Sequence, residues 1–193
     1  MEDISNYNIH EGSFGWHAIY TRHQHEKTIA RLLSDRGFEV FLPLYATARR
    51  WKDRTKRLSL PLFPCYVFIW GGLERRLDIV TAPGFHSFVT VGNRPAMIPQ
   101  PEIEAIRRAL EKGSAVEPFP FLKSGDVVRI KSGPLEGIEG ILVRKKNSFR
   151  LVLSVELLQK SVAVEVDATM VERVAGRSGA APQSWLAATA STI

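Results

Sequence analysis

The sequence has few of the residues on which most catalytic and metal-binding sites depend. Cys65 is the only cysteine among 193 residues, which excludes an internal disulfide and a multi-cysteine zinc site. No glycine-rich phosphate loop of the Walker type and no G-x-S-x-G nucleophile motif occurs. His17, His23 and His25 lie close together, but no clustered carboxylates or cysteines accompany them, and Cys65 lies in an apolar run without an activating base. We therefore expect no enzyme, no cofactor and no metal site.

Long apolar runs are also absent. No stretch approaches the roughly 18 consecutive apolar residues of a membrane span, and the first residues, MEDISNYNIHEG, have no signal-peptide pattern. These features predict a monomeric cytoplasmic protein that does not bind membranes. The 26 Lys and Arg residues outnumber the 20 Asp and Glu residues, and this net charge of +6 favours an anionic partner.

The chain has two regions with different sequence patterns. Residues 15–113 alternate between strand and helix patterns, in the order β-α-β-β-α-β-α, which predicts an antiparallel sheet flanked by helices, an α+β domain. Helices are expected at 25–37, 73–82 and 101–113, and a charged hairpin or loop at 47–57. Residues 122–174 hold only short alternating strands and turn signals, which predict a small β-barrel of five strands. Residues 114–121 read as a linker, and 1–14 and 175–193 as flexible tails.

The decamer PLFPCYVFIW, residues 61–70, is apolar on both faces if it forms one strand. A strand in a small domain usually buries one face and exposes the other to solvent. Counting by twos places Tyr66, Phe68 and Trp70 on one face, and Phe63 and Cys65 on the opposite one. The aromatic rings are either ordinary core or part of a surface that a partner covers.

Four segments together resemble a known family. WHAIYTRHQHEK, PLFPCYVFIW, VTAPGFHSFV and GDVVRIKSGPLEGIEG occur in the order found in NusG-type transcription elongation factors. The first three resemble the N-terminal NusG (NGN) domain, and the last resembles the KOW motif of an SH3-like β-barrel. YTRHQHEK and the basic segment RRWKDRTKR resemble the specialised, RfaH-like antiterminators. Where Cys65 stands, the family often has glycine.

The resemblance implies that the first domain binds RNA polymerase. The partners would be the clamp helices of the largest polymerase subunit and the gate loop of the second-largest subunit, and binding would suppress pausing and termination. The residues that match these contacts are Tyr20, Phe63, Tyr66 and Phe68 for the clamp helices, and Arg75 and Arg76 for the gate loop.

The resemblance also implies binding of DNA, chiefly the non-template strand of the transcription bubble. Arg22 would pair with phosphate and His23 would stack on or hydrogen-bond a base, whereas the alternative is an ordinary solvated surface. The basic hairpin would hold upstream duplex DNA by charge. The full set comprises Arg22, His23, His25, Lys27, Arg49, Arg50, Lys52 and Arg54.

In the KOW barrel, the segment ELLQKSV matches the loop that recruits further partners. Leu158 occupies the apolar position, and Gln159 and Lys160 replace the usual Gly-Arg. This departure counts against Rho binding and leaves a small-subunit ribosomal protein as the partner of this loop. Two alternative functions stay open: a general NusG that couples polymerase to Rho or the ribosome, and a ribosomal or RNA-binding KOW protein.

Overall fold

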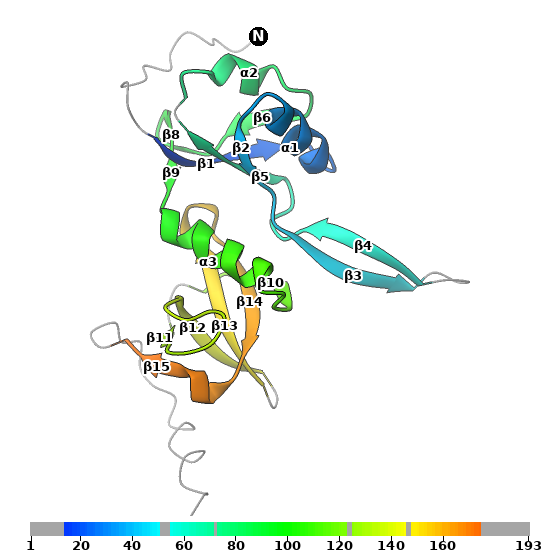
Figure 1. Cartoon of the computed structure of the whole chain (residues 1–193). Helices are drawn as coiled ribbons and strands as arrows, with labels where there is room; N and C mark the ends of the chain where they lie inside the picture. The colour runs from blue at the N-terminus through cyan, green and yellow to red at the C-terminus, as the bar shows by residue number, and fades with distance from the viewer. Residues whose placement is uncertain (1–13, 51–54, 72, 123–124, 146–147, 175–193) are drawn as a thin grey trace, which may run out of the picture. The chain divides into compact units, whose positions relative to one another are not determined.

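The computed structural model describes residues 14–50, 55–71, 73–122, 125–145 and 148–174 (Figure 1). The chain forms two compact units, the first of residues 1–107 with 155–158 and the second of residues 108–154 with 159–193. Apart from Phe14, the two predicted tails lie outside the described residues. Within the described ranges, no helix has the length and apolar character needed to cross a membrane.

The first unit is built on a five-stranded antiparallel sheet. Strands β2 (Glu39–Phe41), β5 (Tyr66–Gly71), β1 (Gly15–Thr21) and β6 (Phe85–Phe88) lie side by side in that order, and β9 (Met97–Ile98) also pairs with β1. Helix α3 (Gln100–Glu111) follows, close to its predicted bounds. The predicted antiparallel sheet with helices is thus confirmed.

Helix α1 (Glu26–Asp35) covers one face of this sheet (Figure 1). Ile29 and Leu33, one helical turn apart, pack into a buried cluster with Ile19 of β1 and with Val67 and Ile69 of β5. The helix ends as the sequence predicts, because Gly37 adopts a left-handed conformation with φ of 82° and its N–H donates to the carbonyl of Ser34. Burial of these apolar side chains fixes which face of each strand points at the helix.

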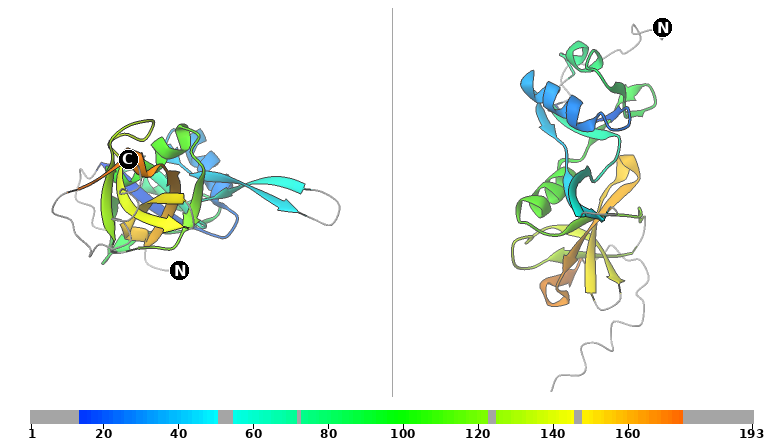
Figure 2. Two further views of the ribbon diagram at one scale, coloured as in Figure 1. Left: turned by 90° about the horizontal axis from the view of Figure 1, so that it is seen from below. Right: turned by 90° about the vertical axis from the view of Figure 1, so that its right-hand side faces the viewer.

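The predicted charged hairpin is confirmed and is longer than expected. Strands β3 (Leu44–Arg50) and β4 (Thr55–Pro61) pair in full antiparallel register from Leu44–Pro61 to Arg50–Thr55. They form a separate two-stranded sheet that extends away from the five-stranded one (Figures 1 and 2). A second small hairpin joins β7 (Thr90–Val91) and β8 (Arg94–Pro95).

The apolar decamer is not one strand, and this prediction was wrong. β4 ends at Pro61, the chain turns through Leu62–Cys65, and β5 begins at Tyr66. Cys65 has a φ of 68°, so the alternation of faces is broken there. Phe63 therefore lies on the same side as Phe68, with ring centroids 5.6 Å apart, and not on the opposite face.

The second unit is all β, as predicted. Its sheet has six strands rather than five, in the order β10 (Val116–Phe119), β14 (Lys160–Val166), β13 (Ser148–Val155), β12 (Glu139–Lys145), β11 (Asp126–Ile130) and β15 (Val171–Arg173). Short 3-10 turns, η2 (Glu156–Leu158) and η3 (Ala168–Met170), connect neighbouring strands. Figure 2 shows the strong curvature of this sheet.

The additional strand lies within the predicted linker. Val116–Phe119 pair with Ser161–Val164 of β14. The prolines of this segment argued against a strand, but β10 is at the edge of the sheet, where a residue without an N–H donor is tolerated. Pro118 therefore marks an edge strand and not an irregular connection.

Candidate functional site

Two strands supply most of the residues that the sequence singled out. On the sheet face opposite α1, β1 places Trp16, Ala18 and Tyr20 beside their β5 partners. These partners are Trp70, Phe68 and Tyr66, respectively. The face is therefore lined with aromatic rings from end to end, and its two ends differ in exposure.

Away from Tyr20 and Tyr66, most rings of this face are covered, and Trp70 at its far end is half-buried. We call Trp16, Phe41, Phe63 and Phe68 the buried ring cluster, in which Phe68 is 0%, Phe63 1% and Trp16 2% exposed and Phe41 is half-buried. Phe68 lies 5.6 Å from Phe63 and 6.1 Å from Phe41, measured between ring centroids. The rings of this cluster pack directly against one another, as aromatic side chains in a protein core do.

Arg107 of α3 lies over this cluster. Its guanidinium carbon is 5.0 Å from the Trp16 ring centroid and 5.3 Å from that of Phe41. The same guanidinium forms an ion pair with Glu39 at 3.0 Å. Cation–π attraction to the ring faces and the ion pair with a carboxylate together hold the arginine in place.

At the other end the rings reach the surface. We call Tyr20, Tyr66 and His86 the tyrosine cluster. Tyr20 is 37% exposed, Tyr66 is half-buried and His86 is exposed. The Tyr20 ring lies 5.3 Å from that of Tyr66 and 5.2 Å from that of His86. Burial raises the pKa of Tyr66 above its usual value of 10.0, and neighbouring Tyr20 and Cys65 raise it further.

The expected polymerase contacts are therefore divided between two environments. Tyr20 and Tyr66 offer their rings to solvent, whereas Phe63 and Phe68 are buried beneath the surface. The two phenylalanines support the sheet from within, and of these four rings only exposed Tyr20 and half-buried Tyr66 reach the surface.

The turn between β1 and α1 continues directly from Tyr20. Arg22, His23 and His25 are all exposed there, and the Arg22 N–H donates to the carbonyl of Gly84 at 2.8 Å. Gly84 has a φ of 95°, and a Cβ at this position would lie 2.6 Å from the Cβ of His25. Glycine is therefore required for the turn to approach so closely. The turn that carries these three side chains directly follows Tyr20 and Thr21 of β1.

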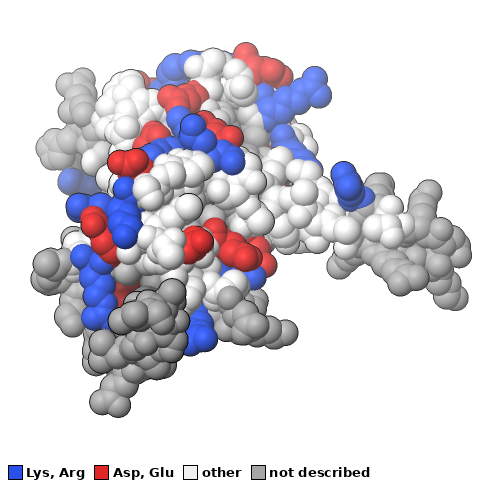
Figure 3. Space-filling model, turned by 60° about the horizontal axis from the view of Figure 1, so that its bottom comes forward, with Lys and Arg blue, Asp and Glu red and all other residues white. Residues whose placement is uncertain are grey.

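Lys27 also lies near this turn but makes an internal contact. Its Nζ donates to the carbonyl of Ser59 in β4 at 2.6 Å, which ties α1 to the hairpin. Of the hairpin residues expected to hold DNA, Lys52 and Arg54 are outside the described residues. Arg49 and Arg50 are in β3, and their side chains are likewise outside the description. On the face in Figure 3, Lys and Arg are interspersed with Asp and Glu, so no single basic surface marks that face.

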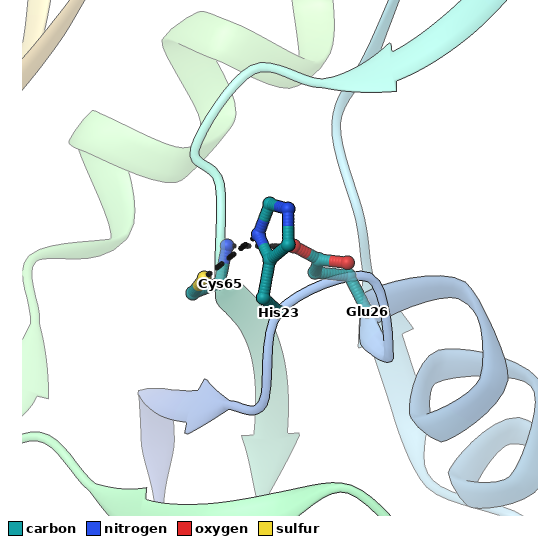
Figure 4. A group of neighbouring side chains, drawn as sticks. All are labelled: His23, Glu26 and Cys65. Carbon is teal, nitrogen blue, oxygen red and sulfur yellow. Dashed lines mark hydrogen bonds between the residues drawn. The ribbon is translucent and has the colours of Figure 1, made fainter.

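Cys65 was wrongly expected to lie within a strand without a nearby base. It occupies the turn before β5, is partly exposed, and its sulfur is 3.9 Å from Nδ1 of His23 (Figure 4). Its N–H donates to Oε1 of buried Glu26 at 2.8 Å, and its carbonyl accepts from the Thr21 N–H at 2.8 Å. Sequence reasoning missed Glu26 and the approach of His23 to Cys65, because 42 positions separate that pair. The family's frequent glycine at this position was the only signal of a left-handed turn.

The arginines expected at the gate loop have different surroundings. Arg75 forms an ion pair with Asp78 at 2.9 Å, donates to the carbonyl of Arg36 and lies 4.5 Å from the Phe38 ring centroid. It therefore joins α2 (Arg76–Val80) to the loop after α1. Arg76 begins that helix, and the following residue, Leu77, is 62% exposed, although the helical pattern of this segment predicts an inward side chain.

The chain turns sharply at Gln159, between η2 and β14, where φ is 50°. A left-handed φ is uncommon at a residue other than glycine, and it marks a tight turn here. Gln159 and Lys160 are exposed, whereas Leu158 is 7% exposed.

Comparison with known proteins identifies the first unit. Residues 14–107 match the family model described as "Transcription termination factor nusG". Residues 14–107 are thus similar to the NusG family, and this match supports the predicted resemblance to NusG-type transcription factors.

Curated relatives that match more than four fifths of the chain carry a similar description. The chain is 24% identical over 172 residues to the transcription termination/antitermination protein NusG of Helicobacter pylori, covering 82% of this chain and 98% of the relative. It is 25% identical over 187 residues to NusG of Borreliella burgdorferi, covering 84% and 100%. The structure of Thermotoga maritima NusG superimposes with a TM-score of 0.51 at 20% identity, covering 84% of this chain and 98% of that one, which confirms the fold.

Proposed function

We propose that this protein is a specialised NusG-type elongation and antitermination factor that binds the RNA polymerase clamp and the non-template DNA strand. The observation that carries the proposal is the position of the tyrosine cluster, which directly adjoins the exposed basic turn Arg22–His25. A protein surface that presents aromatic rings beside basic groups suits a partner that offers a helix and a nucleic-acid strand together.

Tyr20 and Tyr66 are the proposed contacts with the clamp helices. Tyrosine is enriched among residues that dominate binding energy, because it offers a large rigid ring and a polar group. The buried ring cluster beneath holds the two strands in register, so the tyrosines are ordered before the partner arrives. Such pre-organisation lowers the entropic cost of binding.

The turn after β1 is the proposed contact with the non-template strand. Arg22 would pair with a phosphate, and the exposed imidazole of His23 would stack on or hydrogen-bond an unpaired base. Lys27 adds positive charge along the same path, and His25 adds a second exposed imidazole. The basic residues of the β3–β4 hairpin would hold duplex DNA by charge, an interaction that weakens steeply with salt.

A third contact involves the gate loop of the second-largest polymerase subunit. The proposed contacts are Arg75 and Arg76, and exposed Leu77 lies beside them in the chain. A factor that bridges both sides of the polymerase cleft would favour the closed state by its differential affinity for the two states. Suppression of pausing would follow without any chemistry by the factor.

The second unit would recruit a further partner through the loop at Leu158–Lys160. Gln159 and Lys160 are the exposed members, and they replace the Gly-Arg pair of the family pattern. We propose a small-subunit ribosomal protein as the partner rather than Rho.

The second candidate function is that of a general NusG. Its support is that the Helicobacter pylori and Borreliella burgdorferi relatives are both named termination/antitermination protein NusG. A specialised factor should require a particular non-template sequence, whereas a general factor should act on every template and bind Rho. Pausing assays on bubbles with varied non-template sequence, with and without Rho, distinguish the two.

The decisive test of clamp binding is the double variant Tyr20→Ala/Tyr66→Ala. With about 2 kcal/mol expected from each ring, affinity for core polymerase should fall by roughly 1,000-fold. Phe14→Ala is the matched control, since Phe14 is an exposed aromatic residue, 64% exposed, next to Trp70 at the far end of the same sheet. Equal polymerase affinity in the double variant and the control would refute the proposal.

A further inference from the structure

Three side chains with metal-binding atoms meet at the edge of the proposed interface. His23 comes from the turn after β1, Glu26 from the first turn of α1, and Cys65 from the turn before β5 (Figure 4). One imidazole nitrogen, one carboxylate oxygen and the sulfur all lie within 4.8 Å of one another. None of the three has a role in binding polymerase in the function proposed above, and only His23 has one in binding DNA.

The backbone holds these groups together. The Cys65 N–H bonds to the Glu26 carboxylate at 2.8 Å, and the Cys65 carbonyl bonds to the Thr21 N–H at 2.8 Å. The turn that carries the thiol is therefore fastened both to α1 and to β1. The left-handed φ of 68° at Cys65 is maintained by these two hydrogen bonds.

The ligand set suits a divalent transition metal. Thiolate, imidazole and carboxylate are the three protein ligands of zinc, which binds them at about 2.0–2.3 Å in tetrahedral geometry. Ligand atoms around such an ion lie about 3–4 Å apart, so the sulfur and nitrogen at 3.9 Å are already at this spacing. The exposed His23 ring can adjust to close the remaining distances, and its exposure leaves the fourth position to water.

The buried negative charge of Glu26 also favours a bound cation. Glu26 is only 5% exposed, and it forms no ion pair with a Lys or Arg in the part of the chain that the structure describes. The hydrogen bond from the Cys65 N–H compensates this buried carboxylate in part, and a bound cation would add to that compensation. A zinc ion bound by one thiolate, one carboxylate and a neutral imidazole would make the group neutral overall.

We propose that His23, Glu26 and Cys65 form a zinc-binding site with one open coordination position. The ligand atoms are Cys65 Sγ, His23 Nδ1 and a carboxylate oxygen of Glu26. Binding releases the thiol proton to solvent. A consequence, which rests on the proposed function, is that zinc withdraws His23 from the non-template strand, so metal and DNA compete for this ring.

The site is tested with cobalt as a spectroscopic probe. The reduced full chain, freed of metal by a chelator, is titrated with Co²⁺, and a thiolate-to-cobalt charge-transfer band should appear and saturate at one ion per chain. Because the chain has one cysteine, the band reports Cys65 alone. Added Zn²⁺ should abolish the band by displacement.

Variants assign the ligands. Cys65→Ser should abolish the band, and His23→Ala should weaken cobalt binding by about tenfold or more. His25→Ala is the matched control, because His25 is exposed in the same turn but is not one of the three converging residues, and it should bind cobalt like the unchanged chain. Circular dichroism of each variant verifies folding, and His23→Ala alone decides the question if Cys65→Ser does not fold.

Three results would overturn the site: no charge-transfer band in the folded chain, a band with two chains per cobalt, or equal cobalt affinity in His23→Ala and His25→Ala. None of these measurements involves polymerase or DNA. Failure of the metal site therefore leaves the proposed clamp binding untouched, and failure of the tyrosine variants leaves the metal site untouched.

Discussion

The two ends of one sheet face differ in chemistry although the same two strands build both. Around Trp16 and Phe68 the rings are wholly hydrocarbon or indole and are buried, with Arg107 over them. Around Tyr20 and Tyr66 every ring carries a polar group and reaches solvent. Strand register places each β1 ring beside a β5 ring, so tilted ring pairs form at both ends, and the ends differ in polar groups and in depth below the surface.

This difference separates stability from binding along a single pair of strands. Buried rings contribute their whole area to folding, whereas a half-exposed tyrosine contributes less to folding and keeps area for a partner. Mutations at the buried end should therefore unfold the unit, and mutations at the tyrosine end should leave it folded. The following predictions test that separation, beginning with the largest effect.

Phe68→Ala should lower the free energy of unfolding by about 3–5 kcal/mol, because it removes a fully buried ring and leaves a cavity. Tyr66→Ala, two residues earlier on the same strand and face, should cost less than half as much. Urea denaturation followed by tryptophan fluorescence measures both. Similar losses for the two variants would break the distinction between the ends.

Arg107→Ala should lower the free energy of unfolding by about 1 kcal/mol, through loss of the ring contacts and of the partly exposed ion pair with Glu39. Arg107→Lys should recover only part of the loss, because an ammonium cannot stack its plane on the rings. The same denaturation assay applies. Glu39→Gln is the control that removes the ion pair and keeps the ring contacts.

Cys65→Gly should raise the free energy of unfolding by about 0.5–1 kcal/mol, since a residue with a Cβ is strained by about 1–2 kcal/mol at a left-handed φ. Cys65→Ala keeps the strain and is the matched comparison. Thermal unfolding of the three chains should rank glycine first. Equal stability of the glycine and alanine variants would show that the turn is unstrained.

The smallest effect concerns pH. Because the pKa of Tyr66 is raised in the folded chain, the unfolded chain loses the phenol proton first as pH rises. The free energy of unfolding should therefore fall as pH rises through about 10 and above, and Tyr66→Phe should remove this contribution. Unfolding measured from pH 8 to 11 on both chains gives the difference, and parallel curves would contradict the assigned burial.

Local patterns were enough to predict much of the fold. Helix α1 with its stop at Gly37, the charged hairpin and the clean alternation of the second unit all follow from periodicity and turn residues. The turn at Leu62–Cys65 could not be predicted, because Cys65 has a side chain that normally avoids its conformation. β10 was missed because a proline such as Pro118 is tolerated only in an edge strand, and which strand lies at the edge depends on the complete sheet.

The candidate site was predicted less completely than the fold. Residue types and order singled out Tyr20, Tyr66 and the basic turn, but parity alone could not separate surface rings from buried ones such as Phe63. The meeting of His23, Glu26 and Cys65 depends on two turns distant in sequence, and no local rule places them together.

The conformation of Cys65 has a consequence for how related chains diverge. Codons for cysteine and glycine differ by one base, and glycine is the residue that this backbone prefers. A single point mutation would thus delete the sulfur and leave the turn, its two hydrogen bonds and the neighbouring tyrosines in place. Reactivity toward metals and alkylating reagents would then change from one lineage to the next within an otherwise constant architecture.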